Sequence, residues 1–327
     1  MLSEFKLITK LTSQLQQQNG SILLGIGDDC AVFEKDAQQV NLISTDALIE
    51  HVHFDLSYTS FADLGRKALA VNLSDVAAMA GEPVCAVISL AIPKHVNESA
   101  LQDFYKGLNA CAKEYEVAIV GGDTCKSLRD FMITVTVVGV AEKSKYKTRS
   151  AAKAGDQIYM SGVLGSSAIG LAGFQQDKAV RDVFKTAHLT PKPQLKLAQV
   201  LAELPEVHAC IDLSDGLLQD LGHVLKQSNV GAKVFEGKVP VHESFTSTCE
   251  SLGLDALQTK LAGGEDYQLL FTVKAGAKEM LSELVLAKGI AMPVCIGEIV
   301  SDDAGLTLLD SQEQEVKIKT QGFDHFK

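Results

Sequence analysis

The chain has 327 residues, with 30 basic and 41 acidic side chains, so its formal charge at neutral pH is −11. The length is typical of two domains that each bury a core, and a hydrophobic content of 46% excludes a disordered chain. General nucleic-acid binding is disfavoured because a negative surface repels a phosphate backbone. Divalent cations held by carboxylates would still let an acidic protein bind phosphorylated ligands.

Neither a targeting signal nor a disulfide framework is visible. The start of the chain lacks the basic-then-apolar order of a signal peptide, and no run of about 18 apolar residues occurs, so we expect a cytoplasmic protein without a membrane span. The seven cysteines are odd in number, have no C-x-x-C spacing and mostly lie beside apolar residues. We expect reduced thiols that bind no zinc.

Short β-branched runs alternate with helical patterns, which predicts a mixed α/β architecture. The expected strands span residues 40–45, 84–91, 117–120, 132–140, 157–161, 209–211, 268–273 and 293–299. The expected helices span residues 4–17, 63–80, 98–114, 195–203, 214–227 and 277–287. Prolines at 191 and 193 end a helical segment, because proline donates no amide hydrogen and disfavours helix in the preceding residue.

A polar, locally basic segment at residues 142–156 follows the expected strand 132–140 and indicates a domain junction. We place an N-terminal domain at residues 1–147 and a C-terminal domain at residues 148–327. The basic side chains of this segment, including Arg149, either form a solvated linker or contact a phosphate, and composition leaves both open.

Carboxylates recur at the ends of apolar runs, often beside glycine. Turns of this kind occupy residues 25–29, 119–123, 210–216 and 263–267, and Asp46 ends a run without glycine. Ligands of α/β folds bind at strand ends, where glycine lets the backbone approach them closely. Each turn alone is better explained by ordinary turn or capping chemistry. Their recurrence favours a shared site.

Asp75 gives a sharper argument. It falls within the apolar stripe of the expected helix 63–80, beside Ala68 and Val71. A carboxylate that faces a core costs several kcal/mol unless it is paired, hydrogen-bonded or bound to a metal. Lys67 or a backbone amide would be an ordinary partner, but we favour a metal ion.

The available ligand atoms are hard. Carboxylate oxygens together with the hydroxyls of Ser44 and Thr45 favour Mg²⁺ or Mn²⁺ over zinc. His51 and His53, spaced H-x-H, offer zinc ligands, but no Cys–His cluster accompanies them, and a substrate contact or a structural role is favoured. Clustered Mg²⁺ suits phosphate chemistry, because the ions offset repulsion between anionic groups.

The common nucleotide signatures are absent from the sequence. It contains no P-loop, no dinucleotide-binding glycine motif after a strand and no protein-kinase motif. The small-residue turn at residues 161–167 either cradles a phosphate at a helix N-terminus or packs a helix tightly against a strand, and the sequence favours neither.

Read together, the motifs resemble the thiamine-monophosphate kinase family, which is related to aminoimidazole ribonucleotide (AIR) synthetase and selenophosphate synthetase. The segments that carry the resemblance are GIGDD (25–29), STD (44–46), VHF (52–54), KALAVNLSD (67–75), GGDT (121–124), TRS (148–150), DLSDGL (212–217), GGEDY (263–267) and GFDHF (322–326). They are spread over nearly the whole chain and keep the family's order. The resemblance implies ATP-dependent phosphorylation of thiamine monophosphate to thiamine diphosphate. It also implies a two-domain α/β fold whose N-terminal sheets pair as a barrel in a homodimer.

The resemblance further implies roles for residues at matching positions. The implied magnesium ligands are Asp29, Ser44, Thr45, Asp46, Asp75, Asp123, Asp212 and Asp215. The implied ATP contacts are Tyr105, Gly122, Asp123, Arg149 and Ser214, and the implied thiamine phosphate contacts are His53, Glu265 and Phe323. Asp46, Asp75 and Asp123 are the expected catalytic residues among these.

The chain departs from the family pattern at a few positions. The usual Gly-Gly-Asp-Thr-Thr-Arg ends in Cys125 and Lys126 here, Cys30 replaces a small residue, and His51 replaces a common glycine. Two alternatives to the kinase are a sibling synthetase and a non-catalytic metal-binding protein. The opening lacks the reactive Cys–Lys loop of selenophosphate synthetases, and the chain has no D-x-D-x-D-G calcium loop.

The implied acceptor has a simple chemical consequence. A phosphate monoester with a second pKa near 6 is largely ionised at neutral pH and needs no strong general base. We therefore expect direct in-line transfer of the γ-phosphoryl group without a phosphoenzyme, with Mg²⁺ ions that bridge both ligands.

Overall fold

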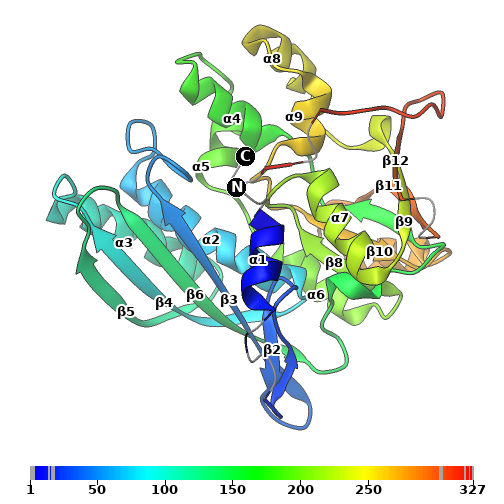
Figure 1. Ribbon diagram of the computed structural model, residues 1–327, viewed down its shortest axis with the longest axis horizontal. Helices are drawn as coiled ribbons and strands as arrows, with labels where there is room; N and C mark the ends of the chain where they lie inside the picture. Colours follow the sequence, from blue (N-terminus) through cyan, green and yellow to red (C-terminus); the bar gives the residue numbers. More distant parts are fainter. Residues whose placement is uncertain are drawn as a thin grey trace.

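The computed structural model describes residues 4–13, 15, 19–301, 305–319, 322, 323 and 325 (Figure 1). This part of the chain forms two six-stranded sheets, one completed before the other begins. The expected mixed α/β fold with two domains is thereby confirmed. The exact division at residues 147 and 148 stays a proposal.

The first sheet has the strand order β1-β2-β3-β6-β4-β5. Its strands are β1 (Ile22–Leu24), β2 (Ala31–Glu34), β3 (Gln39–Ile49), β4 (Glu82–Ile92), β5 (Ala118–Lys126) and β6 (Met132–Glu142). All neighbours are antiparallel except β4 and β5, which are parallel and are joined through helix α3 (Glu98–Glu114). Strand β5 therefore ends the sheet as an edge strand.

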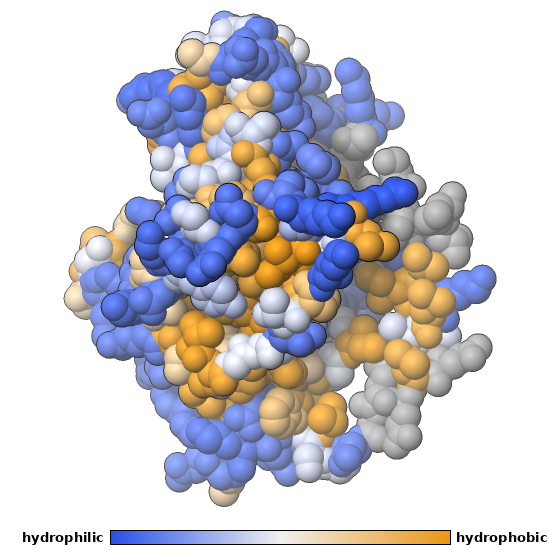
Figure 2. Space-filling view, turned by 90° about the vertical axis from the view of Figure 1, so that its left-hand side faces the viewer, coloured by the Kyte–Doolittle hydropathy of each residue, from blue (hydrophilic) through white to orange (hydrophobic). Residues whose placement is uncertain are grey.

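One face of this sheet is covered and the other is exposed. Alternate residues of β6, such as Ile133 and Val135, are buried in the core that includes helix α2 (Phe61–Ala78) and α3. The opposite face leaves Val87, Val120 and Met132 exposed. Figure 2 shows apolar side chains gathered on the side of the molecule where this sheet lies.

The second sheet has the order β12-β9-β11-β7-β10-β8, and only β12 and β9 are parallel. Its strands are β7 (Gln157–Met160), β8 (Val207–Asp212), β9 (Gly231–Phe235), β10 (Leu269–Val273), β11 (Val294–Val300) and β12 (Leu306–Leu309). The remaining helices are α1 (Glu4–Thr12), α4 (Ser166–Gln175), α5 (Asp182–Leu189), α6 (Leu195–Glu203), α7 (Leu217–Ser228), α8 (Phe245–Leu252), α9 (Ala256–Ala262) and α10 (Lys278–Ala287), with 3₁₀ turns η1 (Arg149–Ala151) and η2 (Glu236–Lys238).

Helix α2 joins the two halves of the molecule. It contacts β3 and β6 of the first sheet, and also β8 and α6 of the second half. Its Leu69 and Leu73 share one buried cluster with Leu201 and Phe271. Because α2 runs between the two sheets, a polar side chain on it can meet loops from both domains (Figure 1).

Every expected strand and helix is present; α3 and α6 have the expected bounds, and the bounds of the others are shifted. The helix expected at residues 4–17 ends at Thr12, and residues 14 and 16–18 lie outside the described residues. Helix α5 ends at Leu189, just before the prolines that predicted a break. All seven cysteines are free thiols. Among the described residues, no helix is long and apolar enough to cross a membrane.

Helices α2 and α3 approach each other closely at two glycines. A Cβ atom at Gly107 would lie 1.8 Å from the carbonyl oxygen of Ala62, and one at Gly65 would lie 2.0 Å from that of Phe104. Gly107→Ala must push the helices apart, so we expect it to lower the free energy of unfolding by about 3 kcal/mol in urea titrations. Gly222→Ala in α7 is the matched control. Its Cβ meets nothing within 4 Å, and it should leave stability unchanged or raise it by up to about 1 kcal/mol.

Candidate active site

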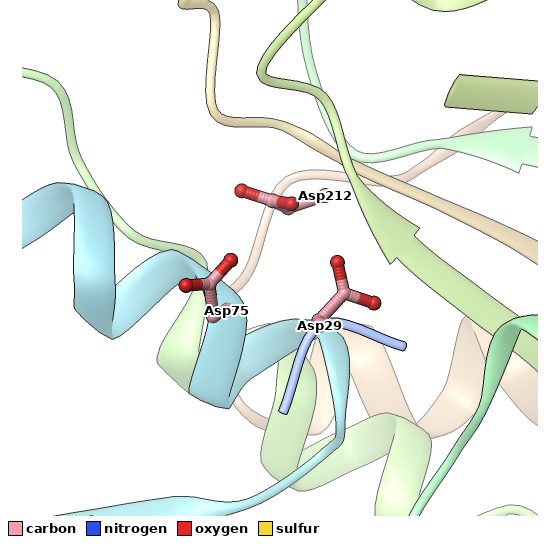
Figure 3. Close-up of side chains that lie close together, drawn as sticks. All are labelled: Asp29, Asp75 and Asp212. Atoms are coloured by element: carbon pink, nitrogen blue, oxygen red, sulfur yellow. The ribbon is translucent and has the colours of Figure 1, made fainter. Parts of the chain in front are cut away.

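Three carboxylates from distant segments converge between the two sheets. Asp29 follows β1, Asp75 lies in the last turns of α2, and Asp212 is the last residue of β8. One oxygen of each lies within 4.8 Å of the other two, and Figure 3 shows the three side chains around a shared space. The acidic residue expected on the apolar stripe of α2 is therefore part of a cluster.

Serine hydroxyl groups donate hydrogen bonds to two of these carboxylates. Ser44 on β3 donates a hydrogen bond to Asp75. Ser74 on α2 donates to Oδ2 of Asp212 at 2.6 Å. Lys67, which the sequence offered as an ordinary partner for Asp75, pairs with Glu265 instead. Its Nζ lies 2.9 Å from Oε1 of Glu265.

Burial and mutual repulsion disfavour ionisation of these acids. Burial, followed by the charges of Asp46, Asp212 and Asp29, raises the pKa of Asp75 well above its usual range. Burial, then the Asp215 and Asp29 charges, raises the pKa of Asp46 to about 6. A divalent cation would remove this penalty by binding the ionised form. The all-oxygen donor set therefore fits Mg²⁺.

Arg149 reaches this cluster from the segment between the domains. Its Nη2 lies 2.6 Å from Oδ1 of Asp29 and its Nε lies 3.1 Å from Oδ2. Its backbone N–H donates to the carboxylate of Asp28. Burial and the Asp29 charge raise the pKa of Asp28 to about 7. Arg149 therefore contacts the acidic cluster, whereas the buried Lys147 donates to the carbonyl groups of Leu204 and Val207.

The cluster opens into a cavity of about 520 Å³, a size typical of small-molecule sites. Twelve of the proposed site residues line it: Asp29, Ser44, Thr45, Asp46, His53, Asp75, Arg149, Asp212, Ser214, Asp215, Glu265 and Phe323. Residues from both ends of the described chain, including Glu4 and His325, also line it.

Three proposed residues do not line this cavity. Gly122 and Asp123 lie on edge strand β5, and Tyr105 lies on α3 with 43% of its surface exposed. At Gly122 a Cβ would lie 1.9 Å from the carbonyl oxygen of Ile88, so the β4–β5 pairing itself requires glycine there. The ligand roles of these three residues stay predictions.

Two motifs of the second half are joined by backbone hydrogen bonds. The amide of Glu265 donates to the carbonyl of Ser214 at 2.7 Å, and that of Tyr267 donates to Leu213 at 2.9 Å. Asp266 is directed elsewhere and accepts from the amides of Gly165 and Ser167 at the start of α4. This carboxylate therefore already takes the amides at the start of α4 that a phosphate would bind, which disfavours a phosphate at the small-residue turn 161–167.

Aromatic rings border another part of the cavity. His53 and His325 have ring centroids 5.1 Å apart, and Phe323 and His325 lie 4.9 Å apart. The backbone N–H of Phe323 donates to the carbonyl of Asp215 at 3.0 Å, which attaches the C-terminal segment to the acidic loop. His325 was not among the predicted contacts, although it belongs to the terminal motif.

The side chains of His51 and His53 have different surroundings. His51 has a left-handed backbone with φ of 66°, which explains why glycine suits this position. Its Nδ1 lies 3.0 Å from Asp55, and only His53 of the pair lines the cavity. This arrangement does not support a zinc site at the H-x-H motif.

Sequence signals existed for some residues that were not assigned. Asp28 stands directly before Asp29 in the GIGDD turn and lines the cavity. Tyr267 closes the GGEDY turn and also lines it. His223 lines the cavity from α7 without any motif that could have indicated it.

Comparison with known proteins agrees with this geometry. The model of the AIR synthase related protein N-terminal domain matches residues 27–141, and that of the C-terminal domain matches residues 153–308. Thiamine-monophosphate kinase of Haemophilus influenzae is 38% identical over 100% of this chain and 98% of its own length. The chain belongs to the thiamine-monophosphate kinase family.

Other members of this family are similarly close. The Escherichia coli enzyme is 37% identical over 99% of this chain and 98% of its own length, and the Bacillus subtilis enzyme is 33% identical over 100% of both. A solved structure described as AaThiL complexed with AMPPCP and TMP superposes with a TM-score of 0.85 and 31% identity. That match covers 99% of this chain and 97% of the other.

Proposed function

We propose that the protein phosphorylates thiamine monophosphate with ATP and releases thiamine diphosphate and ADP. The observation that carries this function is the convergence of Asp29, Asp75 and Asp212 in a cavity lined by the family's motifs. Full-length identity to thiamine-monophosphate kinases supports it. A sibling synthetase or a non-catalytic metal-binding protein is not favoured.

The residues of the cavity fit a division of labour. Asp29, Ser44, Thr45, Asp46, Asp75, Asp212 and Asp215, with Asp123, would hold Mg²⁺, which offsets repulsion between the phosphate groups. Arg149 and Ser214 would contact ATP. His53, Glu265 and Phe323 would contact thiamine monophosphate, with Phe323 against an aromatic ring.

The reaction is a direct transfer. An oxygen of the acceptor phosphate forms the new bond to the γ-phosphorus, and the bond from that phosphorus to the β,γ-bridging oxygen breaks as ADP leaves. Because the acceptor oxygen is already ionised at neutral pH, the protein's task is to orient the two phosphates and exclude water.

One assay separates the kinase from its alternatives. ADP formation should require both Mg²⁺ and thiamine monophosphate, and thiamine diphosphate should appear in equal amount. ADP formation without thiamine monophosphate would contradict the assignment.

Acid quench during turnover should recover no phosphate covalently bound to the protein, and trapped phosphate would contradict direct transfer.

A homodimer would complete this site. Edge strand β5 carries Gly122 and Asp123, and the uncovered face of the first sheet exposes Val87 and Val120 at 40% and 61%. An edge strand beside an apolar face favours association with a second copy. We infer that the first sheets of two copies associate there, which brings Asp123 and Tyr105 toward bound ATP.

A cytoplasmic location of the protein also stays a prediction.

A charge on the exposed face tests this dimer. Val87→Asp is expected to convert the protein to a monomer in sedimentation experiments and to lower kcat at least tenfold, because a carboxylate in an apolar interface loses its hydration. The control Leu286→Asp changes an apolar side chain on α10 that is 65% exposed, and it should alter neither mass nor activity. A Val87→Asp variant that stays dimeric would contradict this interface.

A further inference from the structure

Glu265 lies on the cavity wall with a protein partner at each carboxylate oxygen. Nζ of Lys67 lies 2.9 Å from Oε1, and Nδ1 of His188 lies 3.2 Å from Oε2. Lys67 and His188 are 1% and 3% exposed, and neither lines the cavity. Two buried groups therefore hold one carboxylate that does face the cavity.

Lys67 also contacts a second segment that lines the cavity. Its Nζ donates to the backbone carbonyl of His53 at 3.4 Å. The ring of His53 is fixed in turn, because Nδ1 accepts from the amide of Ile49 at 3.1 Å and leaves Nε2 for another partner. The Lys67 ammonium on α2 thus contacts both the loop after β3, at His53, and the loop at 263–267, at Glu265.

The backbone of Glu265 is held in an unfavourable conformation. Its φ of 62° is left-handed, a region that non-glycine residues rarely adopt. Such backbones persist only where surrounding contacts impose them, and they cluster at functional sites. The contacts present here are the hydrogen bond from the Glu265 amide to the carbonyl of Ser214 and the carboxylate contacts with Lys67 and His188. Ser167 Oγ lies 3.1 Å from Nδ1 of His188 and holds that imidazole in turn.

The charges of the group determine what it can recognise. Burial lowers the pKa of His188, so its imidazole is neutral at pH 7, and the Lys67 ammonium balances the Glu265 carboxylate. A carboxylate balanced in this way acts as a directional hydrogen-bond acceptor more than as a free charge. The pyrimidine ring of thiamine carries an amino group, which is the matching donor.

We propose that Lys67 and His188 are positioning residues that fix Glu265 as the acceptor for the pyrimidine amino group of thiamine monophosphate. The proposal rests on the kinase function and deepens it. Lys67 and His188 act through Glu265, and Lys67 acts also through the His53 backbone, without touching substrate.

Steady-state kinetics of Lys67→Met test this role. We expect KM for thiamine monophosphate to rise about tenfold or more, with kcat and KM for ATP within about threefold of wild type. Wild type should discriminate against the analogue that lacks the pyrimidine amino group, and Lys67→Met should lose most of that discrimination. Lys67→Arg retains the charge and should recover part of the effect.

Two further variants keep the test decisive. His188→Leu removes the other partner of Glu265 and should raise KM for thiamine monophosphate several-fold, whether or not Lys67→Met folds. Lys147→Met is the matched control, because Lys147 is also a buried lysine, 7% exposed, whose ammonium donates to the carbonyl groups of Leu204 and Val207 outside the cavity. It should lower the melting temperature and leave KM for thiamine monophosphate unchanged.

Other outcomes would overturn the proposal. A folded Lys67→Met or His188→Leu with unchanged KM for thiamine monophosphate would do so, as would an equal loss for both substrates. Wild type that fails to phosphorylate thiamine monophosphate would overturn the kinase function instead. Equilibrium binding of thiamine monophosphate to wild type and Lys67→Met would still decide the positioning role in that case.

Discussion

Asp75→Asn is expected to lower kcat about a thousandfold while the fold is retained. Asp75 lies beside Asp29 and Asp212 in the acidic cluster, and Ser44 already donates to it. An amide keeps the size of the side chain but removes the anionic oxygen that a hard cation requires. Losing one ligand of a charge-stabilising site has costs of this order.

The same substitution should stabilise the protein when no divalent cation is present. Burial and the charges of Asp46, Asp212 and Asp29 disfavour the ionised form of Asp75. Removing one of several crowded acids relieves this repulsion, so we expect stability to rise by about 1 kcal/mol, or about 2–4 °C in melting temperature.

Thermal unfolding with EDTA and a coupled ADP assay measure the two effects. Asp182→Asn is the control, because its side chain is 96% exposed at the start of α5 and should change neither quantity. Unchanged turnover in Asp75→Asn would refute its role as a ligand. A melting temperature that falls together with kcat would indicate a structural role instead.

Long elements were predictable from sequence because their periodicity is strong. Helix α3 has its expected bounds, and strands β3 and β6 extend the expected runs. The short strands β1 and β12 escaped prediction. They have three and four residues, and β12 pairs in parallel with β9, far away in sequence, so no local pattern specifies it.

The acidic cluster was predictable where one pattern recurs or where a charged residue falls at an apolar position. Acids beside glycine at strand ends indicated Asp29 and Asp212, and a carboxylate on an apolar stripe indicated Asp75. The pairing of Lys67 with Glu265 was not predictable, because it joins α2 to a loop of the other domain. Sequence could not show either that Asp123 lies on an edge strand, outside the cavity of a single chain.

Chelation of divalent cations is expected to abolish turnover and to make stability depend strongly on pH. In the metal-free protein, burial raises the pKa of Asp28 to about 7 and that of Asp46 to about 6, against about 4 in an unfolded chain. The folded state therefore holds more protons than the unfolded state between about pH 4 and pH 7. The stability that these two raised pKa values contribute is fully present below that window and is lost as pH rises through it.

Magnesium should reverse this loss, because it binds the ionised carboxylates and favours the folded state. The rise in melting temperature on adding MgCl₂ should therefore be small at pH 5 and grow to several degrees at pH 7.5. Asp75→Asn should show a smaller rise at pH 7.5 than wild type, since one ligand is missing. An equal rise at both pH values would mean that Mg²⁺ binds elsewhere, because only ligands that titrate within this window make the effect depend on pH.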